Sequence, residues 1–322
     1  MNRSGLKLLS LTTLLGSLLN AMPAQANDAL ASSVALGTED SVETVILPVI
    51  NVDHNFDAEE EPMAPPFLPS TDDVTPNFDA DIELAPSAAR AVELYNNGVA
   101  HYQESNYALA IADFNEAIAA KSDYAEAYVF RAAAKLALND GAAAMDDYIN
   151  AISVRPDYAL AYFSRGALFY EMGETASAME DFNQAIAIAP DYTEAHNYLG
   201  LAEASIGNHE GALIHYDTAL SLDPLYAPAH MHRGASLIKL EEFDTAATHL
   251  SIAIENSDRY AEAYINRAVA YYHLGTYPAA LADLNEALDI NPNSSEAYFN
   301  RSYVYSVLGR PTDALSDINN VL

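Results

Sequence analysis

The sequence predicts an all-α fold in which seven helix-turn-helix units stack in single file as a solenoid. The main observation is an alanine that recurs every 34 residues, without insertion or deletion, from residue 91 to the end of the chain. A strict period of this size indicates one supersecondary unit stacked on its own copies. Such a rod buries a core only between neighbouring units, so we expect its function to depend on shape. The alanines are Ala110, Ala144, Ala178, Ala212, Ala246, Ala280 and Ala314.

Three further repeat positions define the helices of each unit. A large apolar residue stands four places after each alanine, and a small residue stands seven places after it in six of the seven units. These spacings place all three residues on one face of the second helix. A Gly, Ala or Ser twelve places before the alanine belongs to the first helix. We expect this small residue to face the alanine and to let the two helix axes approach closely.

Turn and end signals separate the helices. A glycine between the two helices predicts a left-handed residue at Gly173, Gly207, Gly275 and Gly309. A proline predicts the end of the second helix at Pro156, Pro190, Pro224 and Pro292. An Asp or Asn three places before a Glu predicts a capping box at Asp123, Asp191 and Asn293.

These columns resemble the tetratricopeptide repeat (TPR) family, whose units carry a large residue, Gly or Ala, Ala, an aromatic residue, Ala and Pro in this order. One unit shows the whole series as Tyr162, Gly166, Ala178, Phe182, Ala185 and Pro190. The resemblance covers residues 91–322, with units beginning near residues 91, 125, 159, 193, 227, 261 and 295. It implies a right-handed superhelix whose concave face is lined by the first helices.

Residues 1–26 have the pattern of a secretory signal peptide. Arg3 and Lys7 precede a short apolar stretch, and Ala24 and Ala26 form a small-residue exit. We therefore expect an exported bacterial protein, in the periplasm first and fully secreted second; the alternative is an uncleaved membrane anchor. The chain has no cysteine, so neither a disulfide framework nor a lipid-modified cysteine is expected.

Residues 27–90 predict an acidic, proline-containing disordered tether. The segment holds 14 acidic residues against one arginine, a composition that does not bury enough apolar surface to offset its ordering entropy. Two features suggest more than a tether. The apolar run 45–52 is suited to adding to a sheet edge, and Asn-Phe-Asp-Ala at 55–58 and 77–80 is either a pair of docking motifs or a compositional echo.

The net charge of −32 restricts the partners. Binding to nucleic acid or to anionic lipid needs cationic groups, so neither partner is expected. A protein with a basic surface, divalent cations and a saline medium are all compatible with this charge. The alternative is that the charge serves solubility alone.

No residue pattern predicts catalysis or a cofactor. The chain lacks a cysteine nucleophile and the GxSxG and HExxH motifs, so we expect a protein that is not an enzyme. Six of the nine histidines fall between residues 196 and 249. The pairs His196/His230 and His215/His249 recur at the repeat spacing, so we interpret them as packing residues, with metal binding as the alternative.

Four units combine an arginine on the first helix with an aspartate on the second. We expect an ion pair between the two helices of each unit, with a structural role. The pairs are Arg131 with Asp147, Arg165 with Asp181, Arg267 with Asp283, and Arg301 with Asp317.

The resemblance also implies which residues line the concave groove. These are Tyr95, Val99, Tyr102, Val129, Phe163, Tyr170, Asn197, Leu201, Met231, Lys239, Ile265, Val269, Tyr272, Phe299 and Tyr303. An apolar and aromatic lining suits a peptide with apolar anchors. Only one lysine is in the set, so a carboxylate clamp is not expected. The alternative role for the aromatic residues is packing between neighbouring first helices.

The sequence as a whole predicts a non-catalytic protein-protein interaction scaffold. One alternative is an accessory factor that recruits a cell-envelope enzyme. Another is a self-assembling structural TPR protein. The chain stops inside the last predicted helix, so we also expect self-association through an uncapped C-terminal unit.

Overall fold

The structure is a computed structural model that describes residues 86–257 and 260–321. The predicted signal peptide and all but the last residues of the predicted tether, with its two Asn-Phe-Asp-Ala motifs, lie outside the described residues. The described residues form fourteen α-helices and no strand, which confirms the all-α prediction. The helices are α3 (Pro86–Gln103), α4 (Tyr107–Ala120), α5 (Ala125–Ala137), α6 (Gly141–Val154), α7 (Ala159–Glu171), α8 (Thr175–Ile188), α9 (Thr193–Ser205), α10 (His209–Leu222), α11 (Ala227–Lys239), α12 (Phe243–Glu255), α13 (Ala261–His273), α14 (Tyr277–Ile290), α15 (Ser295–Val307) and α16 (Pro311–Val321).

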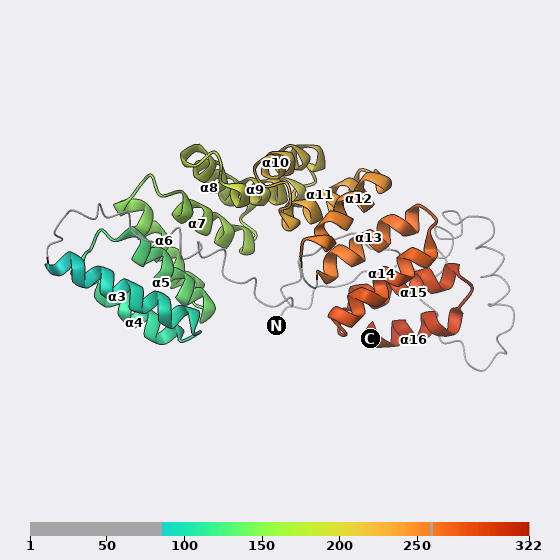
Figure 1. Cartoon of the computed structure of the whole chain (residues 1–322), viewed down its shortest axis with the longest axis horizontal. Coiled ribbons are helices and arrows are strands. Elements are labelled where there is room, and N and C mark those ends of the chain that lie inside the picture. Colours follow the sequence, from blue (N-terminus) through green and yellow to red (C-terminus); the bar gives the residue numbers. More distant parts are fainter. Residues whose placement is uncertain (1–85, 258–259, 322) are drawn as a thin grey trace.

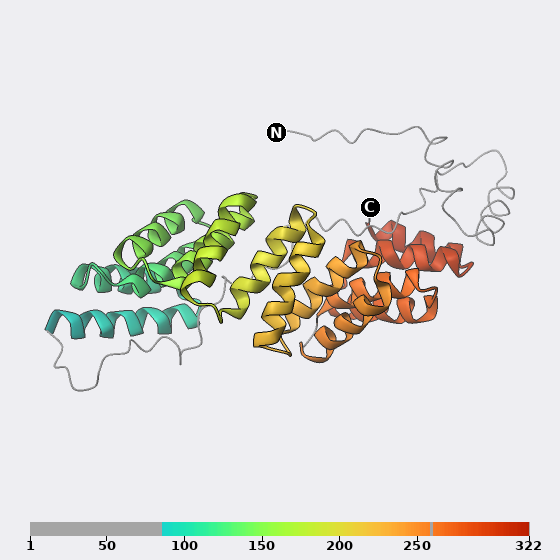
Figure 2. The same ribbon diagram turned by 90° about the horizontal axis from the view of Figure 1, so that it is seen from above.

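Consecutive helices pair as hairpins, and the hairpins stack into an arched rod (Figure 1). The view from above shows the same units in single file (Figure 2). The first helices of neighbouring units pack against each other, from α3 on α5 to α13 on α15, whereas neighbouring second helices make little contact. Elements on the inside of a curve lie closer together than those on the outside. The first helices therefore line the concave side of the rod. The first of them, α3, begins at Pro86, ahead of the expected start near residue 91.

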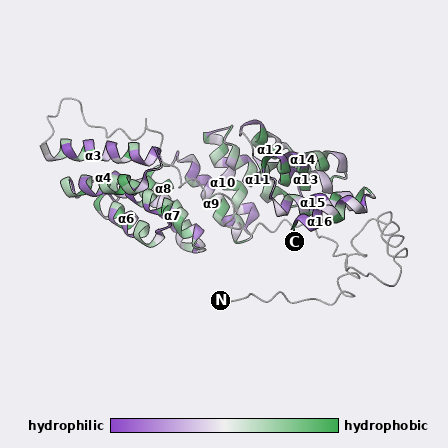
Figure 3. Cartoon of the chain, turned by 90° about the horizontal axis from the view of Figure 1, so that it is seen from below, coloured by the Kyte–Doolittle hydropathy of each residue, from purple (hydrophilic) through white to green (hydrophobic). Residues whose placement is uncertain are grey.

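The periodic residues form the core. The recurring alanine is fully buried in six units and nearly so at Ala314. The large residue four places later is also buried, as at Phe114, Phe182 and Leu250. Each unit therefore contributes one short apolar stripe, and the stripes of neighbouring units join into four clusters of buried residues along the described rod. Figure 3 shows hydrophobic and hydrophilic residues interspersed along these helices.

The small residue of the first helix has a different partner from the predicted one. A Cβ on Gly200 would lie 2.6 Å from Cε1 of Tyr216, and a Cβ on Gly234 would lie 2.5 Å from Cγ of Leu250. The space beside the glycine is thus filled by the large residue of the second helix. The recurring alanine lies farther away, with the Ala212 carbonyl oxygen 3.1 Å from the Cβ that Gly200 would carry. We correct the prediction accordingly: the glycine makes room for a ring or a branched side chain.

The turns between paired helices follow the prediction. The four glycines have φ values of +76°, +84°, +73° and +70°. In the other three units, Ser105, Asn139 and Glu241 adopt the same left-handed conformation, with φ near +60°. This conformation costs a residue with a Cβ about 1–2 kcal/mol, so these three turns are strained relative to the glycine turns.

The predicted capping boxes are wrong. α5 and α9 begin directly after Tyr124 and Tyr192, which make no side-chain capping bond. α15 is capped by Ser294, not by the predicted Asn293; the Ser294 Oγ accepts from the backbone N–H of Ala297 at 3.2 Å. The position before α5 and α9 holds a tyrosine whose ring packs against the preceding unit. Tyr124, for example, is buried, and its ring centroid lies 5.0 Å from that of Tyr95. Burial of the ring has replaced capping at these starts.

None of the helices in the described part is long and apolar enough to cross a membrane.

Candidate protein-binding surfaces

The fifteen predicted groove residues all lie on first helices, and the structure divides them into two groups. Six are partly exposed: Val99, Tyr170, Lys239, Tyr272, Phe299 and Tyr303. Nine are buried: Tyr95, Tyr102, Val129, Phe163, Asn197, Leu201, Met231, Ile265 and Val269. Only the first group offers side-chain surface to a partner in this conformation.

The buried group fills the joints between units. The Tyr95 ring meets Phe130 of the next unit edge to face, with centroids 5.5 Å apart. Phe163 meets Tyr198 in the same way at 5.2 Å. Packing of this kind contributes about 0.5–1.5 kcal/mol per ring pair beyond area burial. The alternative role named above, packing between first helices, therefore applies to these residues.

The partly exposed aromatic residues cluster toward the C-terminal end of the rod. The rings of Tyr272 on α13 and Tyr303 on α15 lie 5.1 Å apart, which joins two consecutive units. Burial, followed by the hydrogen bond with Tyr303, raises the pKa of Tyr272 above its ordinary value. Burial likewise raises the pKa of Tyr170. Both phenols therefore keep their proton at neutral pH.

The four predicted arginine–aspartate pairs are confirmed. In each, the arginine Nε donates to the aspartate Oδ2 at 2.7 or 2.8 Å. All four aspartates are buried. The hydrogen bond to the aspartate is the first cause that raises the pKa of Arg165, Arg267 and Arg301. These arginines remain charged and hold the two helices of a unit together.

Three of these arginines also reach the preceding unit, a contact that the sequence analysis missed. The Nη1 of Arg131 donates to Asn115 Oδ1 at 2.6 Å, and the Nη1 of Arg301 donates to Asn285 Oδ1 at 2.7 Å. The Nη1 of Arg267 donates to Ser251 Oγ at 3.0 Å. The acceptors recur 16 residues before each arginine, so this spacing is the signal that identifies them.

Most of the positively charged side chains of the described residues are paired with a carboxylate. Besides the four pairs above, Arg155 bonds Glu126 and Arg233 bonds Asp217, at 2.8 and 2.7 Å. Arg90 pairs with Glu93 on its own helix, and Arg310, directly before α16, pairs with Asp313 on that helix. The chain has 46 acidic and 14 basic residues, so the carboxylates left over dominate its exterior.

Two of the period-related histidines bond each other. The Nε2 of His230 lies 3.1 Å from the carbonyl oxygen of Pro224, and its Nδ1 lies 2.8 Å from Nδ1 of His249. A carbonyl only accepts, so His230 Nε2 carries a proton. One of the two Nδ1 atoms then carries the proton of the bond between the two histidines. Their rings stack with centroids 5.0 Å apart, which agrees with the packing interpretation.

Burial lowers the pKa of four histidines, His209, His215, His249 and His273. The pKa of His249 falls to about 4, and Arg233 and His230 on α11 add to the effect of burial while Asp217 on α10 opposes it. The unfolded chain takes up the proton near pH 6.5, above the pKa in the folded chain. The stability that His249 contributes is therefore present above pH 6.5 and is lost as the pH falls toward 4.

We predict a pH-dependent loss of stability that His249→Gln reduces. The amide of glutamine has both a donor and an acceptor for His230 Nδ1 but takes up no proton. Between pH 7 and pH 5, the free energy of unfolding of the wild type should fall by about 1 kcal/mol more than that of the variant, after discounting for the partial exposure of His249. Urea denaturation at both pH values measures this difference. Equal changes in the two proteins would contradict the assignment.

The described part of the chain holds no group of three or more His, Asp or Glu side chains arranged for a metal ion.

Stacked helical hairpins with an inner row of first helices define the class of protein, a helical-repeat solenoid. Family models then identify the repeat. Models described as tetratricopeptide repeat match residues 233–295 and 284–316, and a model described as TPR repeat matches residues 133–173 and 166–207. The chain belongs to the tetratricopeptide repeat family.

Solved structures show the same fold. A chain of the APC/C hetero-tetramer Cut9–Hcn1 matches with a TM-score of 0.61 and 17% identity, over 73% of this chain and 50% of that one. This chain thus spans about half the length of that relative. A tetratricopeptide repeat protein from Parabacteroides merdae matches with a TM-score of 0.58 and 18% identity, over 72% and 92% of the two chains. PilF from Pseudomonas aeruginosa matches with a TM-score of 0.60 and 15% identity, over 66% and 97%. No curated protein matches the chain.

Proposed function

We propose that the protein is a non-catalytic scaffold that binds a protein or peptide along the concave face of the rod. Tetratricopeptide repeat proteins are protein-interaction scaffolds, and they are generally non-catalytic. The first helices of neighbouring units pack against each other on the inner side of the arch that Figure 1 shows, and six of their predicted groove side chains are partly exposed. We also propose that the protein acts outside the cytoplasm, in the periplasm first, on the strength of the signal-like residues 1–26.

The observation that carries this proposal is the aromatic cluster of Tyr272, Phe299 and Tyr303. These side chains are partly exposed on α13 and α15, where the buried packing of the earlier units gives way to accessible rings. Aromatic residues supply a large share of binding energy at protein interfaces because they bury much surface at a small entropic cost. Tyr170 provides a second partly exposed ring on α7.

The charge of the rod indicates the chemistry of the partner. Most described cations are bonded to carboxylates of the rod, which leaves a surplus of acidic groups. We therefore propose a partner with apolar anchors flanked by basic residues. Complementary charge speeds association and makes it sensitive to salt.

Affinity capture from a periplasmic extract, followed by titration of the purified partner, tests the proposal. The probe is the full chain and the matched variant Tyr170→Ala/Tyr272→Ala/Tyr303→Ala. We expect one partner to be retained by the wild type, with its affinity reduced at least about tenfold in the variant. Raising the salt from about 50 to 500 mM should weaken the same complex.

The control is Ile214→Ala/Leu225→Ala, which removes two exposed apolar side chains that do not belong to the groove. It should bind like the wild type. Circular dichroism establishes that both variants remain helical. Equal binding by the groove variant and the wild type, or equal loss in the groove variant and the control, would exclude the groove as the binding surface.

A further inference from the structure

The series of hydrogen bonds by which arginines reach the preceding unit is interrupted between the second and third units. The Nη1 of Arg131, Arg267 and Arg301 each donates to a polar side chain 16 residues earlier, on the second helix of the preceding unit. For Arg165 the equivalent residue is Ile149, an aliphatic side chain that is 47% exposed. Arg165 uses Nε and Nη2 on Asp181, each at 2.8 Å, and no acceptor among the described residues meets its Nη1.

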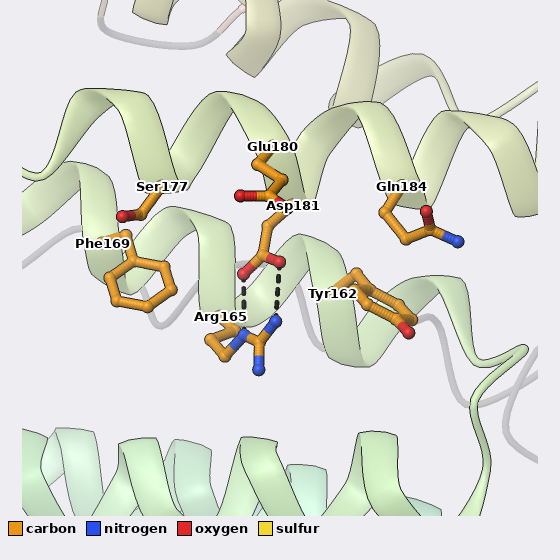
Figure 4. A pocket seen from close by; sticks show the side chains of 7 residues that line it. All are labelled: Tyr162, Arg165, Phe169, Ser177, Glu180, Asp181 and Gln184. Carbon is orange, nitrogen blue, oxygen red and sulfur yellow. Dashed lines mark hydrogen bonds and ion pairs between the residues drawn. The ribbon is translucent and has the colours of Figure 1, made fainter.

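A depression of about 500 Å³ lies beside Arg165, and all the residues that line it belong to α7 and α8. Its lining includes Arg165 between the rings of Tyr162 and Phe169 on α7, and the carboxylates of Glu180 and Asp181 on α8. Figure 4 shows the guanidinium bonded to Asp181 on one side, with its third nitrogen turned away from the aspartate. The contact between α6 and α7 is also the least extensive between any two consecutive units of the described part. We call this depression the Arg165 notch.

The position of the Arg165 notch separates it from the concave groove. The equivalent arginine of the preceding unit, Arg131, bonds Asn115 on α4 and Asp147 on α6, which are both second helices. A guanidinium at this place thus lies between neighbouring second helices, on the convex side of the rod. A ligand in the notch would not compete with one in the groove.

We propose that the Arg165 notch is a second docking point, which takes a side-chain amide, of asparagine or glutamine, from a partner polypeptide. The chain itself shows the complementary group, because the Nη1 of both Arg131 and Arg301 is occupied by an asparagine amide oxygen. A neutral amide fits better than a carboxylate. Asp181 already balances the charge of Arg165, and Glu180 repels a second anion. The rings of Tyr162 and Phe169, with centroids 5.8 and 5.9 Å from Arg165 Cζ, flank the guanidinium that the amide would meet.

The test follows the Nε–Hε resonance of Arg165 in ¹⁵N-labelled full chain, assigned by its loss in Arg165→Lys. The probes are three blocked tripeptides with alanine at both ends and Asn, Asp or Leu in the centre, each titrated to about 20 mM because so small a ligand binds weakly. We expect a saturable shift with the Asn peptide, at an affinity at least about tenfold above that of the other two. No shift, or equal shifts with all three peptides, would overturn the proposal.

Two variants make the test specific. Ile149→Asn supplies the missing amide from within the chain, so the Asn peptide should lose at least about tenfold in affinity. Asn285→Ile removes the acceptor at Arg301, which also lies between two rings, Tyr298 and Tyr305. This variant should gain a shift at the Arg301 resonance. An unchanged titration in Ile149→Asn, or no gained response in Asn285→Ile, would show that the interruption does not make a site.

Discussion

Replacing Phe182 by alanine should destabilise the rod by about 3–5 kcal/mol. The Phe182 ring is fully buried on α8. Its centroid lies 5.8 Å from that of Phe163 in its own unit and 5.7 Å from that of Tyr198 in the next unit. It also fills the space that Gly166 leaves open. The substitution therefore removes one ring that packs against both units at this joint. In a one-dimensional array each unit is stabilised by its neighbours, so unfolding should also become less cooperative at this joint.

Urea denaturation followed by circular dichroism measures both effects. The control is Ile214→Ala, on the second helix of the neighbouring unit, where the side chain is 66% exposed. This change should alter the free energy of unfolding by no more than about 0.5 kcal/mol. A loss below about 1 kcal/mol in Phe182→Ala, or similar losses in both variants, would mean that the joint is not held by this ring.

Replacing Asp147 by alanine should cost about 2–3 kcal/mol. The Asp147 carboxylate is buried and accepts from Arg131 Nε at 2.8 Å and from Lys135 Nζ at 2.7 Å. Removing it leaves two partly buried cations without their carboxylate partner. Loss of one partner from a fully buried pair costs about 3–5 kcal/mol, and we reduce this because both cations reach solvent. In a chain with a net charge of −32, losing a carboxylate otherwise relieves repulsion, so a net loss must arise from the broken pair.

The neighbouring residue supplies the matched control. Asp146 is exposed on the same helix, and Asp146→Ala removes the same charge without touching the pair. It should leave the free energy of unfolding within about 0.5 kcal/mol of the wild type. The double variant Arg131→Met/Asp147→Leu should recover part of the loss, because an apolar pair leaves no uncompensated charge from these two residues. Equal effects of Asp146→Ala and Asp147→Ala would contradict a structural role for the pair.

The helices, their order and the glycine turns were predictable because they depend on local information. A repeated spacing of 34 residues states the period directly, and a left-handed turn needs glycine for steric reasons within a few residues. The arginine–aspartate pairs were predictable for a related reason, since both partners recur at fixed places in the same unit. The capping boxes failed because packing between units decides the residue before each helix: Tyr124 is buried in the core and makes no capping bond.

The candidate groove was only partly predictable. Tyr95 and Tyr303 both occur on the inner side of first helices, yet Tyr95 is buried against Phe130 while Tyr303 is partly exposed. Phe130, which covers Tyr95, belongs to the next unit and lies about a full repeat away in sequence, whereas no described unit follows α15 and α16 to cover Tyr303. The same argument applies to the Arg165 notch, where one aliphatic residue on the preceding unit leaves a donor without an acceptor.

The sequence by itself thus determined the repeat, the helical class, the charge and the pairs within each unit, because each rests on spacing inside a single hairpin. Only the tertiary structure decided which inner side chains remain accessible and which arginine lacks its third acceptor. Accessibility depends on how one unit packs against the next, and that packing combines side chains that are distant in the chain.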